Sequence, residues 1–245
     1  MVLVIFLIGL CLGSFLNVVI HRMPRERSLL LPSSSCPKCK HKLRWIHNIP
    51  VFSFIYLKGA CAFCRKPISW RYPVVELLTG VACAFLYLHF GSNRIFFETV
   101  IFSLLLISLI FIDFEHQILP DELNFSLLWI GLLVSTLPGF TSPEDAIVGA
   151  AVGYSSLWFI AKMYEFVTHR EGMGYGDFKL LAALGAWTGW IALPWIVLIA
   201  ALLGSVVAIT LIAAKKANSK TAIAFGPYLA IAGWVVLIWG KQAFF

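Results

Sequence analysis

The sequence predicts an all-α membrane protein with about eight transmembrane helices and one cytoplasmic loop that binds zinc. The composition is the first reason, because 60% of the 245 residues are hydrophobic, only 13% are charged, and the mean hydropathy is +0.88. Soluble globular domains have a much lower apolar share. The second reason is a series of apolar stretches near the length of about 20 residues that a membrane-spanning helix needs. The third is a polar segment with two pairs of cysteines.

The apolar stretches are separated by charged residues, proline or glycine, which sets the predicted helix boundaries. They cover 1–20, 73–90, 96–113, 122–139, 145–164, 177–190, 192–213 and 223–240. The stretch 177–190 is the weakest of them, because it is short, is rich in small residues and runs almost directly into the next one. The chain is therefore divided into a first helix at 1–20, a soluble loop at 21–72, and a helical bundle at 73–245.

The distribution of basic residues predicts the orientation. The first apolar stretch is followed by the basic run "HRMPRER", the reverse of the charge order in a secretory signal, so this helix is expected to stay attached. With eight helices, every lysine and arginine except Arg94 and Lys241 lies on the same side as loop 21–72. The positive-inside rule places that side in the cytoplasm and the N-terminus in the periplasm. The net charge of +7 is then a topology signal that also suits contact with anionic lipid, and nucleic-acid binding is not needed to explain it.

The four cysteines of loop 21–72 form two Cys-x2-Cys pairs. Cys36 and Cys39 make the first pair, and Cys61 and Cys64 make the second after 21 intervening residues. Such pairs can hold four thiolates around one metal, and a reducing cytoplasm disfavours structural disulfides. We expect structural zinc, because a loop with few core-forming residues needs a bound metal or another crosslink to stabilise its fold. The alternative is four unligated thiols or a redox pair.

Other cysteines and histidines are expected to have ordinary roles. Cys11 and Cys83 fall within predicted helices and are interpreted as packing residues. His41 and His47 could replace a cysteine as metal ligands, but a surface position in a basic loop is the favoured interpretation.

Two aspartates lie at the cytoplasmic ends of predicted helices. Asp113 ends the stretch 96–113, and Asp177 opens the stretch 177–190. Both fall on the same membrane face, so the bundle can bring them together. Carboxylates at membrane depth are costly and indicate function. Two close aspartates share one proton and so offer a base and an acid together, which is what hydrolysis of a peptide by water requires.

Glycines precede the second aspartate in the motif "GYGD". Gly174 and Gly176 have no side chains, so the backbone there can approach an extended substrate and can adopt positive φ. The alternative is a purely structural one, in which Asp177 is the N-cap of a helix and accepts amide hydrogen bonds. The same applies to Asp121, which follows Pro120 and would cap the next helix.

Taken together, these motifs resemble the prepilin peptidases, which process type IV pilins and the pseudopilins of type II secretion. The resemblance runs over nearly the whole chain, and the order and joint presence of the motifs are highly specific. The stretches that carry it are "GSFLNVVIHRMP", "CPKCKHKLRWIHNIPVFSF", "ISWRYPVVELLTG", "LIFIDFEHQILPDELN", "GMGYGDFKLLAALGAWTG" and "FGPYLAIAG".

The resemblance implies a bifunctional enzyme of the bacterial inner membrane. The family's catalytic aspartates correspond to Asp113 and Asp177. Family members cut a short basic leader from prepilins or pseudopilins after a glycine, on the cytoplasmic side. They then methylate the new N-terminal residue, often phenylalanine, with S-adenosylmethionine. The tetracysteine loop is typical of the members that methylate. The chain departs from the family at Ala60, where a lysine is common, so a basic role there would fall to Lys58.

Three other classes compete with this interpretation. A proton-coupled transporter would use intramembrane Asp113 and Asp177 as relays, but it leaves the cysteine loop unexplained. A scaffold that recruits partners through its metal module would leave the two aspartates unexplained. An intramembrane aspartyl protease of the presenilin or signal-peptide-peptidase type also has a Gly-x-Gly-Asp motif, but the cysteine loop and "GSFLNVVIHR" count against it. The position of the methyl-donor site stays open, with Glu76 in "VVELL" as one polar candidate.

Overall fold

A computed structural model describes the chain except for residues 30–34, 37, 44, 170–171, 215–223 and 244–245. In the residues it describes, the only regular elements are helices. Two isolated β-bridges, Ser35–Lys42 and Ala60–Pro67, lie within the segment 21–72. The α-helices are α1 (Val2–Arg22), α2 (Phe52–Tyr56), α3 (Arg71–Phe90), α4 (Arg94–His116), α5 (Asp121–Ser135), α6 (Pro143–Thr168), α7 (Tyr175–Thr188), α8 (Leu193–Ala213) and α9 (Gly226–Ala243). The predicted all-α class is confirmed.

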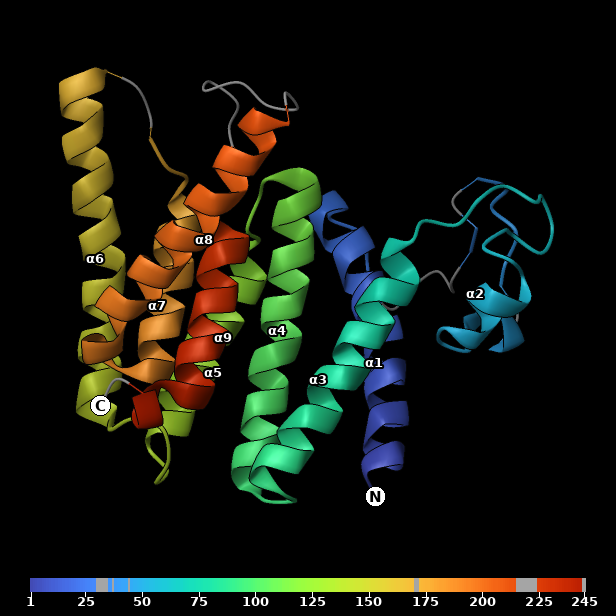
Figure 1. Ribbon diagram of the computed structural model, residues 1–245, viewed down its shortest axis with the longest axis horizontal. Helices are drawn as coiled ribbons and strands as arrows, with labels where there is room; N and C mark the ends of the chain where they lie inside the picture. The colour runs from blue at the N-terminus through green and yellow to red at the C-terminus, as the bar shows by residue number, and fades with distance from the viewer. Residues whose placement is uncertain (30–34, 37, 44, 170–171, 215–223, 244–245) are drawn as a thin grey trace. The chain divides into compact units, whose positions relative to one another are not determined.

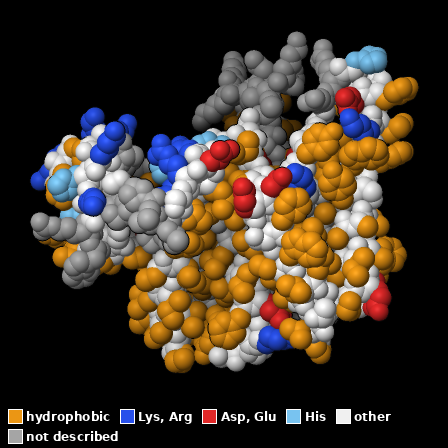
Figure 2. Space-filling view, turned by 180° about the vertical axis from the view of Figure 1, so that it is seen from behind, with side chains coloured by type: hydrophobic (Ala, Val, Ile, Leu, Met, Phe, Trp, Pro, Cys, Tyr) orange, Lys and Arg blue, Asp and Glu red, His pale blue; other side chains and the backbone are white. Residues whose placement is uncertain are grey.

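Each of the eight predicted apolar stretches contains a helix, but the helices differ in length. Five are long and apolar enough to cross a membrane: α1, α3, α4, α6 and α8. The apolar part of α9 is shorter, and α5 and α7 have only 15 and 14 residues. The chain is therefore a multi-pass membrane protein, while the exact number of eight spans stays a prediction. Figure 2 shows hydrophobic side chains spread over the outside of the helices, as lipid contact requires.

The chain divides into two compact units, residues 1–108 and 109–245. In the first unit, α1 packs along α3 (Figure 1). Small residues allow this close approach, because a Cβ atom at Gly9 would meet Gly80 and the side chain of Cys83. Cys83 is buried in this contact, as predicted, whereas Cys11 is exposed on α1, so the packing role predicted for Cys11 is wrong.

In the second unit, α7 is enclosed by other helices. It packs against α5, α6, α8 and α9, and nearly all of its residues after Gly176 are buried. The indole N–H of Trp187 donates to the carbonyl of Leu127 in α5 at 2.9 Å, and both groups are buried. On the α6 side, the backbones of Gly149 and Gly185 approach so closely that neither position has room for a Cβ atom.

The length of α7 explains why its hydropathy signal is weak. Fourteen residues extend for about 21 Å at a rise of about 1.5 Å per residue, which is less than the hydrocarbon core of about 30 Å. Neighbouring helices rather than lipid surround it, and buried small residues replace the long apolar side chains of a lipid-facing span. The helix is thus held inside protein from Asp177 onward, while Tyr175 at its start is exposed.

Candidate active site and metal centre

The two predicted catalytic aspartates lie on different helices of the second unit. Asp113 is in the last turn of α4 and is 5% exposed. Asp177 is the third residue of α7 and is 9% exposed. They are close enough for the charge of Asp113 to act on Asp177. The fold therefore brings together two nearly buried carboxylates that are distant in sequence.

Backbone amides hold each carboxylate in place. The N–H of Gly226, the first residue of α9, donates to the side chain of Asp113. The N–H of Gly174 donates to the side chain of Asp177, and the N–H of Asp177 donates to the Gly174 carbonyl at 3.2 Å. A fixed carboxylate keeps the geometry that proton exchange with a substrate needs. Sequence reasoning gave Gly226 no role, although it stands in the motif "FGPYLAIAG".

At the glycines of the "GYGD" motif, the structure shows close packing at Gly176 and no positive φ at Gly174, and the approach of an extended substrate stays a prediction. Gly174 has φ −77° and ψ 147°, so no positive φ is required there. A Cβ atom at Gly176 would lie 2.8 Å from the Cβ atom of Leu119, in the turn between α4 and α5. A Cβ atom at Gly226 would also meet Leu119. Leu119 thus packs against glycines on both sides, and the glycine at 176 lets α7 reach it.

The capping roles proposed as alternatives are not observed. The N-cap of α7 is Gly174 and not Asp177, and the N-cap of α5 is Pro120 and not Asp121. Neither helix has a side-chain capping hydrogen bond. Asp121 instead accepts from the ammonium of Lys179 in α7, at 2.6 and 2.8 Å to its two carboxylate oxygens.

The four cysteines of the loop form a cluster in the first unit. The Sγ atoms of the four cysteines (Cys36, Cys39, Cys61 and Cys64) all lie within 4.8 Å of one another. The Sγ atoms of Cys36 and Cys64 are 3.9 Å apart. Tetrahedral zinc with Zn–S bonds of about 2.3 Å requires sulfur atoms roughly 3.8 Å apart. The cluster therefore fits zinc, as predicted, and His41 and His47 are not among the clustered ligand atoms.

Both cysteine pairs are presented by the same backbone turn. In the first, the N–H of Cys36 donates to the His41 carbonyl, and the N–H of Lys40 donates to the Cys36 carbonyl. In the second, the N–H of Cys61 donates to the Lys66 carbonyl, and the N–H of Arg65 donates to the Cys61 carbonyl. The residue after each second cysteine has positive φ, 58° for Lys40 and 57° for Arg65. Two copies of one turn explain why the four thiols converge.

Backbone amides near the cysteines favour the thiolate form of two of them. The amides of Cys64 and Phe63 lower the pKa of the Cys61 thiol to about 7, toward the thiolate that a metal needs. For Cys39, the amide of His41 acts in the same direction, but desolvation and the neighbouring thiols raise the pKa to about 11. Four thiols this close ionise together only when a cation neutralises them, which is what zinc would do.

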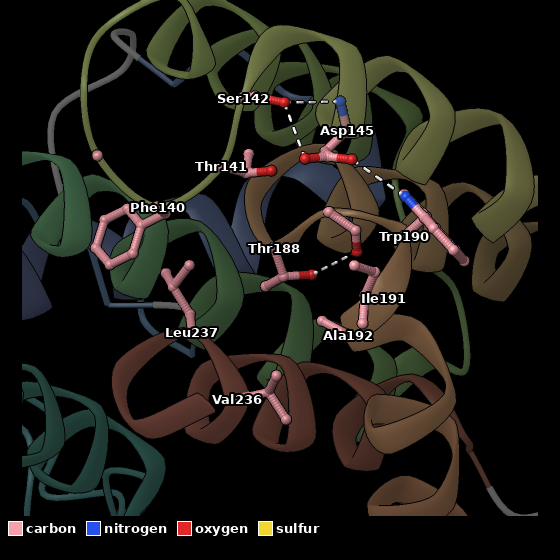
Figure 3. Close-up of a pocket in the computed structure, with 12 residues that line it drawn as sticks. Phe140, Thr141, Ser142, Asp145, Thr188, Trp190, Ile191, Ala192, Val236 and Leu237 are labelled. Atoms are coloured by element: carbon pink, nitrogen blue, oxygen red, sulfur yellow. Dashed lines mark hydrogen bonds between the residues drawn. The ribbon is translucent and has the colours of Figure 1, made fainter. Parts of the chain in front are cut away.

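A cavity of about 450 Å³ lies at the other end of α7 from Asp177 (Figure 3). Its one carboxylate, Asp145, accepts from the Ser142 hydroxyl at 2.9 Å and from the Trp190 indole at 3.1 Å. Ser142 also caps α6 by accepting from the Asp145 N–H. The polar groups of this cavity therefore satisfy one another and fix the start of α6, and they do not form a catalytic pair.

Comparison with known proteins places the chain in a family. Residues 7–90 match the bacterial Peptidase A24 N-terminal domain, and residues 100–209 match the type IV leader peptidase family. A prepilin leader peptidase/N-methyltransferase of Stutzerimonas stutzeri is 44% identical over 98% of this chain and 91% of its own length. The chain belongs to the type IV leader peptidase family. Proteins of the same name from Pseudomonas aeruginosa and Neisseria gonorrhoeae are 43% and 41% identical, over 98% and 94% of this chain and 91% and 87% of theirs.

The two matches divide the candidate sites between them. The type IV leader peptidase match contains both Asp113 and Asp177, and the N-terminal domain match contains all four clustered cysteines. No solved structure gives a significant match to the chain.

Proposed function

We propose that this type IV leader peptidase family member is a bifunctional enzyme of the bacterial inner membrane. It cleaves the leader from type IV prepilins or type II secretion pseudopilins after a glycine, at the cytoplasmic face. It then methylates the amino group of the new N-terminal residue. Family membership and the names of the relatives support both activities over a transporter, a scaffold or a presenilin-type protease.

The observation that carries the proteolytic activity is the meeting of two nearly buried carboxylates from α4 and α7. Asp113 and Asp177 interact electrostatically, and a backbone amide orients each. Two carboxylates that face each other hold one proton between them, because both ionised forms together are disfavoured. The pair is therefore supplied with one base and one acid.

The pair can hydrolyse a peptide bond without a covalent intermediate. The ionised carboxylate takes a proton from a water molecule as the water oxygen bonds to the scissile carbonyl carbon, and the protonated carboxyl gives its proton to the carbonyl oxygen. The carbon–nitrogen bond then breaks as the amine nitrogen receives a proton from the carboxyl that accepted one, and the other carboxylate takes back a proton from a hydroxyl of the tetrahedral intermediate as the carbonyl forms again. The pair returns to its starting state with one proton.

The position of the pair suits cleavage at the cytoplasmic face. Asp177 lies in the first turn of α7, two residues before Lys179, and the distribution of basic residues supports a cytoplasmic position for this end. The family resemblance implies a substrate with a short basic leader on the cytoplasmic side. Cleavage at this end releases the leader and leaves a new amino group on the remaining chain.

Methylation involves the first unit in this proposal. S-adenosylmethionine supplies an electrophilic methyl group, which the new amine takes up with loss of one proton while the donor's carbon–sulfur bond breaks. The metal held by Cys36, Cys39, Cys61 and Cys64 is structural zinc, since four thiolates leave no open coordination position for a substrate.

Leader cleavage and methylation can be measured in the same reaction. The purified full-length protein in detergent is incubated with a prepilin, with or without S-adenosylmethionine, and the products are weighed by mass spectrometry. We expect loss of the leader in both reactions and one added methyl group only with the donor. A matched prepilin with a bulky residue in place of the glycine before the scissile bond is the control and should stay intact. An uncut normal prepilin, with protein that is folded by circular dichroism, contradicts the proposal.

A further inference from the structure

A second cavity lies in the first unit, between the turn around α2 and the start of α3. Its volume is about 600 Å³, within the range of roughly 300–1,000 Å³ that is usual for small-molecule sites. It is lined by Val51, Phe54, Ile55, Lys58, Gly59, Pro67, Ile68, Trp70 and Pro73. The chemistry proposed for the aspartates and the cysteines uses none of these residues.

The walls of the cavity offer flat aromatic surfaces and one charge. The rings of Phe54 and Trp70 lie 4.9 Å apart between centroids with an angle of 59°, and Trp70 is 73% exposed, so its indole face is free for a ligand. Aromatic faces bind planar bases by stacking and bind cations through the ring quadrupole. Lys58 is the only charged side chain among the lining residues, so it can receive an anionic group.

One wall is held in an unusual backbone conformation. Val51 has φ 61° and ψ −48°, and the N–H of Phe52 donates to the Pro50 carbonyl, which makes Val51 the centre of a γ-turn with positive φ. A β-branched residue adopts this conformation rarely, and such strain persists only where the surroundings impose it. Strained residues of this kind cluster at ligand sites.

A buried carboxylate imposes the strain. The N–H of Val51 donates to Oε2 of Glu76 at 2.7 Å, and Glu76 is 7% exposed. The hydroxyl of Ser14 donates to the same side chain. Glu76 therefore ties the wall of the cavity to the contact between α1 and α3. It acts as a positioning residue, which gives a physical reason for a carboxylate in the apolar stretch "VVELL".

We propose that this cavity binds S-adenosylmethionine, with the adenine against Trp70 and Phe54 and the carboxylate of the methionine part at Lys58. The ligand has one planar base, two cations (the sulfonium and the α-ammonium) and one carboxylate, and the cavity offers aromatic faces for the base and the cations and the Lys58 ammonium for the carboxylate. This inference rests on the methylation in the proposed function and assigns the site for its donor.

Equilibrium dialysis of radiolabelled S-adenosylmethionine against the purified full-length protein tests the site by binding alone. Trp70→Ala and Lys58→Gln should each weaken binding by about tenfold or more. Tyr56→Ala is the matched control, because Tyr56 is 75% exposed on α2 and does not line the cavity. Its affinity should equal that of the wild type. Unchanged zinc content and unchanged leader cleavage identify variants that fold.

The outcomes separate the site from the activity. Wild-type affinity in both folded cavity variants overturns the site and leaves methylation standing. A wild type that binds the donor too weakly for dialysis can still methylate a pre-cleaved pilin peptide. In that case the KM for S-adenosylmethionine is measured in place of the dissociation constant, and an unchanged KM in both variants overturns the site. A wild-type protein that neither binds the donor nor methylates the peptide overturns the proposed methylation, and the donor site fails with it.

Discussion

Lys179 of α7 donates to both carboxylate oxygens of Asp121, at 2.6 and 2.8 Å, and so joins the N-terminal ends of α7 and α5. The Lys179 ammonium also lies 5.5 Å from the ring centre of Phe125, one turn along α5. Asp177 stands two residues before Lys179. The ion pair therefore lies beside the candidate active site without belonging to the carboxylate pair.

The first prediction is that Asp121→Asn has a small effect. Asp121 is largely exposed, and exposed ion pairs contribute only about 1 kcal/mol or less. The amide also keeps an oxygen that can accept from Lys179. The rate of leader cleavage should therefore fall by less than about fivefold, as 1 kcal/mol implies. A rate loss as large as that of a catalytic variant would move the first catalytic role from Asp113 to Asp121.

The second prediction compares the two glycines of the motif. A Cβ atom at Gly176 would lie 2.8 Å from the Cβ atom of Leu119, whereas at Gly174 the nearest atom is an oxygen of Asp177 at 3.9 Å. Gly176→Ala should therefore lower the melting temperature and cleavage together, and Gly174→Ala should leave the melting temperature unchanged. Thermal unfolding in detergent measures the first effect and a cleavage assay the second. Equal melting temperatures for both variants would contradict the packing role of Gly176.

The third prediction concerns the metal. The purified protein, prepared without chelator, should contain about one zinc ion, and Cys36→Ser with Cys39→Ser should release it, because two thiolates cannot complete a tetrahedral site. Leader cleavage should be near normal, while methylation or the stability of the loop should fall. Cys11→Ser with Cys83→Ser is a control that removes two thiols outside the cluster and should keep the metal. Wild-type protein without zinc in metal analysis would refute the assignment.

The fourth prediction concerns orientation. Loop 21–72 should face the cytoplasm, because nearly all basic residues then lie inside. A reporter that is active only in the periplasm should be inactive when fused within this loop and active when fused at residues 91–93, between α3 and α4. The opposite pattern would place the carboxylate pair on the periplasmic side and remove the argument for cytoplasmic cleavage.

Much of the fold could be predicted because hydropathy reports on lipid contact. The long helices α1, α3, α4, α6 and α8 present apolar side chains outward, and the sequence indicates each of them. Hydropathy predicts α7 poorly for the opposite reason, since Gly185 and other small residues pack against helices rather than lipid. Where a helix end is buried among other helices, the hydropathy pattern of the sequence does not show where that helix ends.

The candidate site was predictable where residue type alone restricts the chemistry. Charged residues in apolar stretches and cysteines in two spaced pairs are rare, so Asp113, Asp177 and the cluster could be named from the sequence. The amide of Gly226 and the contact of Leu119 with Gly176 depend on which helices become neighbours. The pairing of Asp121 with Lys179 replaced a predicted cap for the same reason, because a local rule on helix ends says nothing of a cation on another helix.

Substitution of each aspartate of the pair by asparagine tests the central claim most directly. Asp113→Asn and Asp177→Asn keep the shape of the side chain but remove the proton that the pair must exchange. Single variants are compared with Asp121→Asn for cleavage of a purified prepilin, at matched levels of inserted protein, and for methylation of a pre-cleaved peptide. We predict that each catalytic variant loses cleavage by several orders of magnitude while methylation survives. Full cleavage by either Asp113→Asn or Asp177→Asn would contradict the assignment.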